Sequence, residues 1–184
     1  MDKLNKITEK NCIKKVWKSE ILLAVLLNLL FLASVLALCN VKYEVSDDFI
    51  MSAIMSGAYG SSLNPHLIFI NILWGYLLLP FYSVFPQISW YLVFQLALCF
   101  LSFTLVSYMV LKKLNRSMAI MIIVLLLTVF GSDAYILVQF TKTAMIAVMG
   151  GSIVFIWALF EEKSLRIEIS AAILCVFGTW LRFN

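Results

Sequence analysis

Charged residues are scarce in this sequence, and their scarcity limits the class of protein. Only 13% of the 184 residues are Asp, Glu, Lys or Arg, whereas a soluble domain is about a quarter charged. There is one histidine, and the net charge of +4 comes from short segments between apolar runs. No basic surface interleaved with aromatic residues is left to hold a nucleic acid, so we expect no nucleic-acid partner. With 63% hydrophobic residues, the composition predicts an integral membrane protein.

Cysteine spacing and the N-terminal segment offer little further chemistry. The four cysteines match no metal-ligand pattern, and most of them lie in or beside apolar runs, as small packing residues do. Lysines crowd residues 1–20, and residues 21–39 carry no charge over a length of about 28 Å, close to the thickness of a bilayer core. Leu38 precedes Cys39 where a lipoprotein cleavage site needs a small residue, so we expect an uncleaved first span.

Apolar runs and basic residues together predict the topology. Runs follow at 66–85, 88–111, 117–131, 143–160 and 167–181, the first of them interrupted by Pro80. The run 117–131 is short, and residues 134–138 offer a continuation of it past Asp133. If 66–85 does not cross the membrane, 11 of the 14 basic residues fall on the cytoplasmic side; if it crosses, only 8 do. We therefore expect an all-α polytopic bundle of about five transmembrane helices in a bacterial plasma membrane. Its predicted parts are a cytoplasmic basic N-terminus (1–20), a first transmembrane helix (21–39), an extracytoplasmic loop with interfacial helices (40–87) and the remaining bundle (88–184).

The loop 40–87 carries the residues best suited to chemistry. Ser46 is a suitable N-cap, and Asp47 and Asp48 suit the first turn of a helix that places Phe49 and Ile54 on one apolar face. Asn64-Pro65 predicts the start of a second helix. Asp47 and Asp48 have two compatible interpretations. They stabilise the helix N-terminus, or they form a carboxylate pair that acts as a general base or holds a divalent metal.

The loop resembles part of a known enzyme superfamily. The stretches that carry the resemblance are Glu44-Val45-Ser46-Asp47-Asp48 directly after the first span, then 56–60, 64–71 and 85–91. They are similar to the N-terminal part of GT-C glycosyltransferases, above all to poorly characterised bacterial multi-pass proteins. The resemblance implies a polytopic enzyme that uses a polyprenyl-phosphate-linked sugar for cell-envelope glycan modification. It also implies that Asp47 or Asp48 is the catalytic base, sometimes with a metal, and leaves the choice between them open.

Three further residues are candidates for substrate binding. Lys142, flanked by two threonines at the start of a span, either snorkels to the interface or contacts a phosphate. Arg182 has the same two interpretations, and each cation needs an acidic or anionic partner, for which Asp133 is one candidate. His66 either occupies the interface or contacts substrate or metal beside the acids.

The sequence also predicts several packing roles and leaves one alternative function open. We expect Asn71 and Gln95 to form interhelical hydrogen bonds, Gly150-Gly151 to allow close helix packing, and Tyr91 to lie at the outer interface. The sequence ends directly after an apolar run, so we expect an N-terminal fragment of a larger enzyme. The alternative is a small non-enzymatic multi-pass membrane protein, a transport or assembly subunit, with an oligomeric state that the sequence does not indicate.

Overall fold

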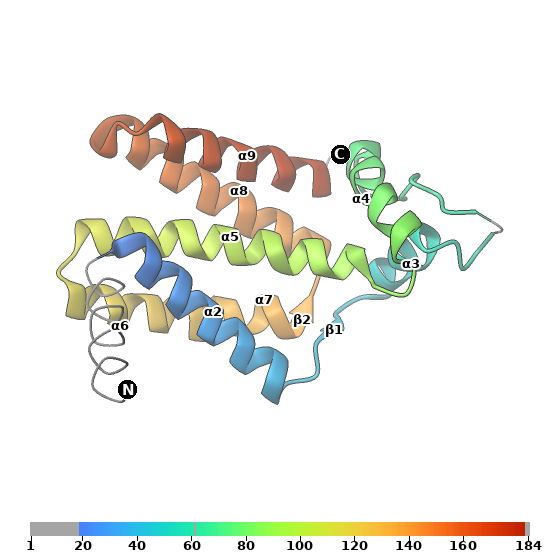
Figure 1. Ribbon diagram of the computed structural model, residues 1–184, viewed down its shortest axis with the longest axis horizontal. Coiled ribbons are helices and arrows are strands. Elements are labelled where there is room, and N and C mark those ends of the chain that lie inside the picture. The colour runs from blue at the N-terminus through green and yellow to red at the C-terminus, as the bar shows by residue number, and fades with distance from the viewer. Residues whose placement is uncertain (1–18, 61, 183–184) are drawn as a thin grey trace, which may run out of the picture.

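The computed structural model describes residues 19–60 and 62–182, and their fold is an all-α helix bundle (Figure 1). The predicted fold class is confirmed. Four helices are long and apolar enough to cross a membrane: Glu20–Leu38, Trp90–Lys113, Arg116–Ile136 and Phe140–Glu162. The fifth expected span corresponds to helix α9 (Leu165–Leu181), whose 17 residues extend for about 26 Å. The chain is therefore a multi-pass membrane protein, and the side that faces the cytoplasm stays a prediction.

Two of the spans contain π-helical turns. The third span consists of α6 (Arg116–Leu126), the π-helical turn η1 (Leu127–Gly131) and α7 (Ser132–Ile136). The fourth consists of α8 (Phe140–Trp157) followed by η2 (Ala158–Glu162). The predicted continuation of the third span past Asp133 is thus confirmed, because the helix runs without a break to Ile136.

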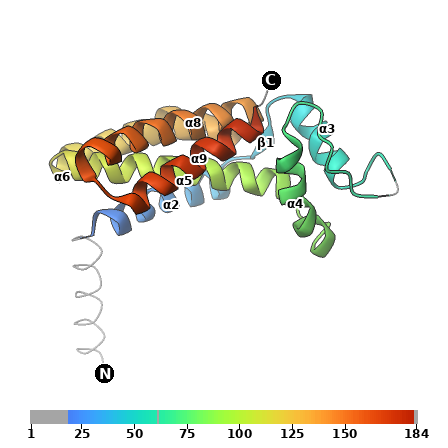
Figure 2. The same ribbon diagram turned by 90° about the horizontal axis from the view of Figure 1, so that it is seen from above.

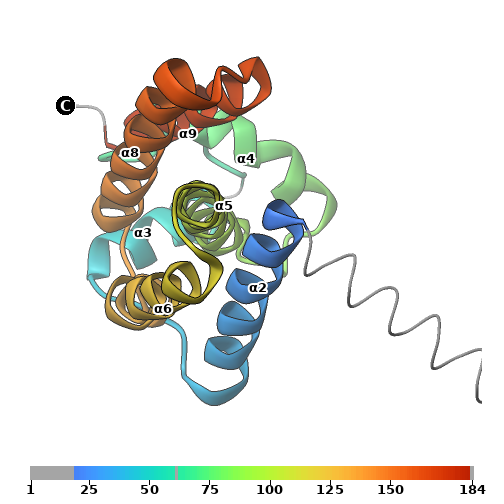
Figure 3. The same ribbon diagram turned by 90° about the vertical axis from the view of Figure 1, so that its left-hand side faces the viewer.

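Helix α5 (Trp90–Lys113) lies in the middle of the bundle, with α2 (Glu20–Leu38), α6 and α8 around it (Figure 3). Asn28 of α2 donates to Ser107 of α5 over 3.0 Å, which joins these helices by a buried polar contact. Helix α9 packs closely along α8 because glycine occupies the contact. A Cβ added to Gly151 would lie 2.8 Å from the carbonyl oxygen of Ala171. The Gly150-Gly151 pair therefore has the predicted packing role.

The loop between α2 and α5 folds against one end of the bundle. It contains strand β1 (Lys42–Tyr43), helix α3 (Ser46–Met55) and helix α4 (Ile72–Val84). Strand β1 pairs in parallel with β2 (Leu137–Val138), which anchors the loop to the junction of α7 and α8. Helix α4 runs across the end of α5 rather than alongside it (Figures 1 and 2).

Three details of this loop differ from the sequence-based prediction. Helix α3 begins at Ser46 after Val45 and has no side-chain cap, and its buried face carries Met51 and Met55 while Phe49 is exposed. Of the face predicted to be apolar, Ile54 packs against the core while Phe49 is exposed, and the sequence left open whether this face rests on lipid or on the bundle. Asp48 points inward, to polar partners on the span helices.

The second helix of the loop begins later than predicted. Helix α4 starts at Ile72, and the Asn71 side chain accepts from Leu73 N over 3.0 Å as its N-cap, not as an interhelical partner. The preceding segment crosses directly over Gly75, where a Cβ would lie only 1.9 Å from the carbonyl oxygen of Pro65. This crossing keeps the Asn64-Pro65 segment extended. Pro80, predicted to interrupt the apolar run, lies inside α4.

Candidate functional site

Asp48 is the centre of a buried polar network where α3 meets α5 and α8. Its side chain is 0% exposed. Oδ1 accepts hydrogen bonds from the Tyr91 hydroxyl at 2.9 Å, from Gln95 Nε2 at 3.2 Å and from the backbone N–H of Phe140 at 3.1 Å. Tyr91 and Gln95 lie one turn apart on α5, and Phe140 is the first residue of α8. One carboxyl group therefore fastens the loop helix to two membrane-spanning helices.

The electrostatics of Asp48 combine burial with a helix end. Burial raises the pKa of Asp48 above its ordinary value of 3.8, and nearby Asp47 raises it further. The hydrogen bonds from Tyr91, Gln95 and Phe140 act in the opposite direction, by stabilising the carboxylate. The positive end of the α8 dipole also favours a negative charge at this position. Asp48 is thus a desolvated acid that binds its proton more tightly than an exposed aspartate.

A cluster of hydroxyl groups surrounds this network on the loop side. The Tyr43 hydroxyl lies 3.0 Å from Ser89 Oγ, which in turn lies 3.1 Å from Ser52 Oγ. Burial raises the pKa of Tyr43, so its phenol stays neutral. The Tyr82 hydroxyl accepts from the backbone N–H of Tyr91 over 3.1 Å. Tyr91 is 0% exposed, because its phenol points into the protein toward the carboxyl of the neighbouring loop helix; the level of this residue at the outer interface stays a prediction.

The network continues from Asp48 into the bundle. Gln95 Oε1 accepts from the Thr143 hydroxyl over 3.1 Å, which confirms the predicted interhelical hydrogen bond and joins α5 to α8. Cys99 Sγ lies 3.7 Å from the same hydroxyl. These buried groups hold one another in place through hydrogen bonds that join α3, α5 and α8.

Asp47 differs from its neighbour in exposure and in partners. Its side chain is half-buried, and within residues 19–60 and 62–182 its carboxylate accepts no hydrogen bond and forms no ion pair. Successive residues on a helix point about 100° apart, so the two acids project in different directions. In the described part of the chain, no group of three or more His, Cys, Asp or Glu residues is placed to hold a metal ion. A divalent metal at this pair stays a prediction.

Lys142 lies between two carboxylates at the same end of the bundle. Its Nζ is 2.9 Å from Glu44 Oε2 and 2.7 Å from Asp133 Oδ2, and it donates to the carbonyl oxygen of Leu137 over 3.0 Å. Asp133, one of the candidate partners, thus pairs with Lys142, and Glu44 is a second partner that the sequence did not indicate. Glu44 reaches Lys142 because it directly follows β1, which pairs with β2 next to α8. The ammonium group is therefore already neutralised within the chain.

Arg182 lies over the first turn of α8. Its Nη1 donates to Thr141 Oγ1 over 3.1 Å, and its guanidinium carbon is 5.6 Å from the centre of the Phe140 ring. The Phe140 ring is also stacked with the ring of Phe69, with an interplanar angle of 10°. Arg182 is exposed, and within the described residues its guanidinium pairs with no carboxylate. It thus presents free donors at the helix end to which Asp48 is bound.

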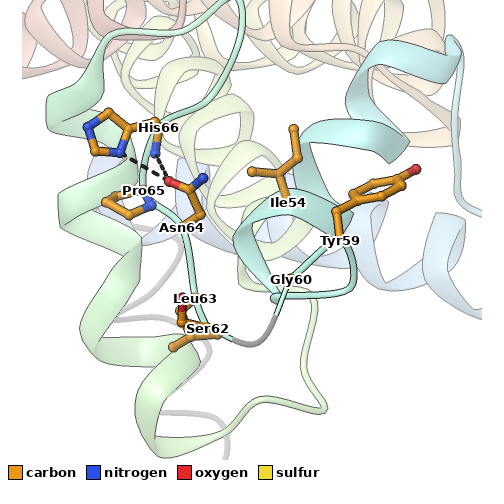
Figure 4. A pocket seen from close by; sticks show the side chains of 8 residues that line it. All are labelled: Ile54, Tyr59, Gly60, Ser62, Leu63, Asn64, Pro65 and His66. Atoms are coloured by element: carbon orange, nitrogen blue, oxygen red, sulfur yellow. Dashed lines mark hydrogen bonds between the residues drawn. The ribbon is translucent and has the colours of Figure 1, made fainter.

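His66 lies apart from these groups, in a pocket of the loop of about 400 Å³ (Figure 4). Asn64 Oδ1 accepts from the His66 backbone N–H over 2.9 Å and lies 3.0 Å from His66 Nδ1. The Tyr59 hydroxyl points away from this pair. The described residues that line it include no Asp, Glu, Lys or Arg: Ile54, Tyr59, Gly60, Ser62, Leu63, Asn64, Pro65 and His66. The structure therefore does not bring His66 together with Asp47 and Asp48.

The geometry gathers four of the five candidate residues at one end of α8. Asp48, Lys142 and Arg182 contact its first turn or its flanking residues, and Asp47 adjoins Asp48 in sequence. The sequence reasoning missed Tyr91 and Thr143 as partners of the network. The Tyr91–Gln95 spacing on a helix, with polar groups in a charge-free run, was the available signal. No family model, curated protein or solved structure matches this chain.

Proposed function

We propose that this protein is a membrane glycosyltransferase of the GT-C type that uses a polyprenyl-phosphate-linked sugar. Asp47 serves as the base that activates the acceptor hydroxyl, and Asp48 holds Asp47 in position. One observation carries the assignment: Asp48 is fully buried by three donors, whereas the adjacent Asp47 keeps a half-exposed carboxylate without a partner in the described structure. A base must reach its substrate within hydrogen-bond distance, and only Asp47 of the two is open to do so.

The reaction needs a proton acceptor and a site for a departing phosphate. Asp47 removes the proton from the acceptor hydroxyl as its oxygen bonds to the anomeric carbon of the sugar. The bond from that carbon to the phosphate oxygen breaks, and the polyprenyl phosphate leaves with the electron pair. Arg182 suits this anion because its planar guanidinium offers several donors to phosphate oxygens. Lys142 is occupied by Glu44 and Asp133, so we assign it to positioning the loop rather than to binding phosphate.

Substitution of each aspartate in turn tests the assignment. Purified protein in detergent would be given a radiolabelled polyprenyl-phosphate sugar together with a membrane extract as the source of acceptor, and transfer would be counted. We expect Asp47→Asn to lower the rate at least 100-fold, because general-base catalysis contributes about that much. Asp48→Asn keeps the acceptor oxygen Oδ1 and should retain most of the rate. Full transfer by the Asp47→Asn variant would overturn the proposal.

A non-enzymatic role in a membrane assembly is the second candidate. The observation that favours it is that the polar groups at this end of the bundle satisfy one another: two carboxylates flank Lys142, and Asp48 has three donors. Such pairing fastens a loop to a bundle without any substrate. Under this alternative, the wild-type protein transfers no label, and neither aspartate variant alters envelope glycan in cells.

A further inference from the structure

Aromatic rings form a continuous cluster where α4 crosses the ends of α5 and α9. Phe81 of α4 lies 5.2 Å from Trp90 and 4.9 Å from Phe94 of α5, measured between ring centres. Trp74 of α4 lies 6.1 Å from Phe177 of α9. Tryptophan and other aromatic residues concentrate at the level of the lipid headgroups in membrane proteins. The cluster therefore marks the depth at which the bundle meets the membrane interface, and α4 lies at this depth.

The exposed surface of α4 is as apolar as its buried surface. Leu73, Tyr76 and Val84 are 46%, 51% and 65% exposed, while Leu78 on the opposite face is fully buried. The sequence from 64 to 111 contains no Asp, Glu, Lys or Arg at all. A helix that is apolar all round does not lie in water. Since α4 crosses the end of a membrane-spanning bundle (Figures 1 and 2), lipid is the medium that covers it.

A cleft of about 180 Å³ opens between α4, α5 and α9 at this level. Its walls are apolar and include Leu77 of α4, Ala97 and Leu101 of α5, and Phe177 of α9. Ala97 and Leu101 are exposed, so the cleft opens toward the lipid that surrounds the spans. Water has few partners in such a site, because a buried water needs two to four polar groups around it.

Trp74 contributes a polar group to this cleft, the N–H of its indole ring. Its side chain lines the cleft and is 1% exposed, yet its indole nitrogen Nε1 has no hydrogen-bond partner among the described residues. Trp90, by comparison, donates its indole N–H to the carbonyl oxygen of Phe85 over 3.0 Å. A buried N–H without an acceptor is costly, so an acceptor from outside the chain would stabilise this arrangement.

We propose that an acyl chain of a bilayer lipid fills this cleft and that its ester carbonyl accepts a hydrogen bond from Trp74 Nε1. The apolar walls match the hydrocarbon, and the aromatic cluster lies at the depth where the ester groups of glycerolipids are found. The ligand class is a glycerolipid, held by one carbonyl and one chain without recognition of a charged headgroup. This site does not depend on the transferase activity proposed above.

The indole N–H signals of the five tryptophans allow a direct test. The protein would be labelled with ¹⁵N-tryptophan and placed in nanodiscs of diacyl phosphatidylcholine, and the Trp74 signal would be identified by its loss in Trp74→Phe. We expect a spin label on the upper acyl chain to broaden the Trp74 signal. Replacing the ester lipid by its diether analogue, which lacks the carbonyl, should move the Trp74 proton upfield. Trp90, bonded within the chain, is the internal control and should not shift.

A matched pair of variants separates occupation of the cleft from general exposure to lipid. Ala97→Phe fills the mouth of the cleft and should abolish the broadening of Trp74. Ala172→Phe adds the same bulk to another cleft, between α8 and α9, and should leave the broadening intact. A Trp74 signal that the spin label does not broaden would overturn the proposal. An unchanged proton shift in ether lipid would overturn it as well, since the N–H would then point at the ring of Phe94 or Phe177.

Discussion

Replacing Asp48 by alanine or by asparagine tests whether one carboxyl group fastens the loop to the bundle. Asp48→Ala leaves the Tyr91 hydroxyl, the Gln95 amide and the Phe140 N–H without their acceptor. Each stranded buried donor costs about 1–3 kcal/mol, so the simple sum is about 3–9 kcal/mol. Part of this loss is offset, because the folded variant no longer has to bury an acidic group away from water. We therefore expect the free energy of unfolding to fall by about 3 kcal/mol.

Asparagine at this position should be far better tolerated. All three donors bind Oδ1, and Oδ2 contacts only the Phe140 nitrogen, which already bonds Oδ1 at the shorter distance of 3.1 Å. An asparagine oxygen in the place of Oδ1 keeps the three contacts to that atom and loses only the longer contact of Oδ2. Its NH2 group then brings two unpaired donor hydrogens to the place of Oδ2, while the cost of a buried charge disappears. We expect a net loss of about 1 kcal/mol.

The two variants would be compared by reversible unfolding in mixed micelles with increasing sodium dodecyl sulfate. Tryptophan fluorescence and circular dichroism would follow the transition. The structure requires Asp48→Asn to be more stable than Asp48→Ala by about 2 kcal/mol. Asp47→Ala, at the half-buried neighbour whose carboxylate has no partner among the described residues, is the control and should stay close to the wild type. Equal stabilities for the alanine and asparagine variants at position 48 would refute the argument, because the acceptor oxygen would then contribute nothing.

Three further outcomes follow from single contacts. Because burial raises the pKa of Asp48 above 3.8, the folded state binds its proton more tightly. The contribution of Asp48 to stability should therefore be fully present below about pH 4 and fall as pH rises through the raised pKa, so the difference between wild type and Asp48→Asn should change with pH in this direction in unfolding experiments. Gly75→Ala places a Cβ 1.9 Å from the Pro65 carbonyl oxygen, so it should lower the free energy of unfolding by about 3 kcal/mol or displace the loop, which limited proteolysis would detect. Gly60→Ala is the control: Gly60 has open space around it, so this variant should neither lower stability nor displace the loop. Lys142→Met should lower the free energy of unfolding by about 1 kcal/mol at low salt, a modest figure because Asp133 is half exposed. The difference from wild type should shrink in 0.5 M salt, about three times the physiological concentration, because salt screens the charges. A difference that stays constant would show that the lost charge is not its cause.

The membrane-spanning helices were predictable because their signal is local. A charge-free run of the length of a bilayer core specifies a helix almost independently of its neighbours, and the residues 21–39 expected from the sequence correspond to α2 at Glu20–Leu38. Lys142 and Asp133 were also predictable as partners, because a cation beside an apolar span needs an anion within reach. Both predictions need only the local sequence and the properties of the membrane, not the contacts between distant segments.

The start of α4 and the orientation of α3 were not predictable, because both depend on contacts between distant segments. The Asn64-Pro65 pair favours a helix start locally, but its backbone passes over Gly75, and that contact is formed only after the loop folds. From the sequence alone, Asp48 suits an exposed position in the first turn of its helix as well as Asp47 does. Its burial depends on Tyr91 and Gln95, more than forty positions along the chain. The distinction between Asp47 and Asp48 therefore required the tertiary structure.

The π-helical turn η1 has a consequence for insertions and deletions in this protein. Residues 127–131 hold one more residue per turn than an α-helix would, and they sit directly before Asp133 and the buried Tyr135. Removing a single residue there would allow ordinary α-helical winding to resume while Asp133 and β2 keep nearly their present orientation. A second deletion in the same helix, with no π turn left to absorb it, would rotate everything that follows by about 100° and turn Asp133 away from Lys142. Two length variants that a hydropathy plot scores alike would thus differ in whether β2 still pairs with β1.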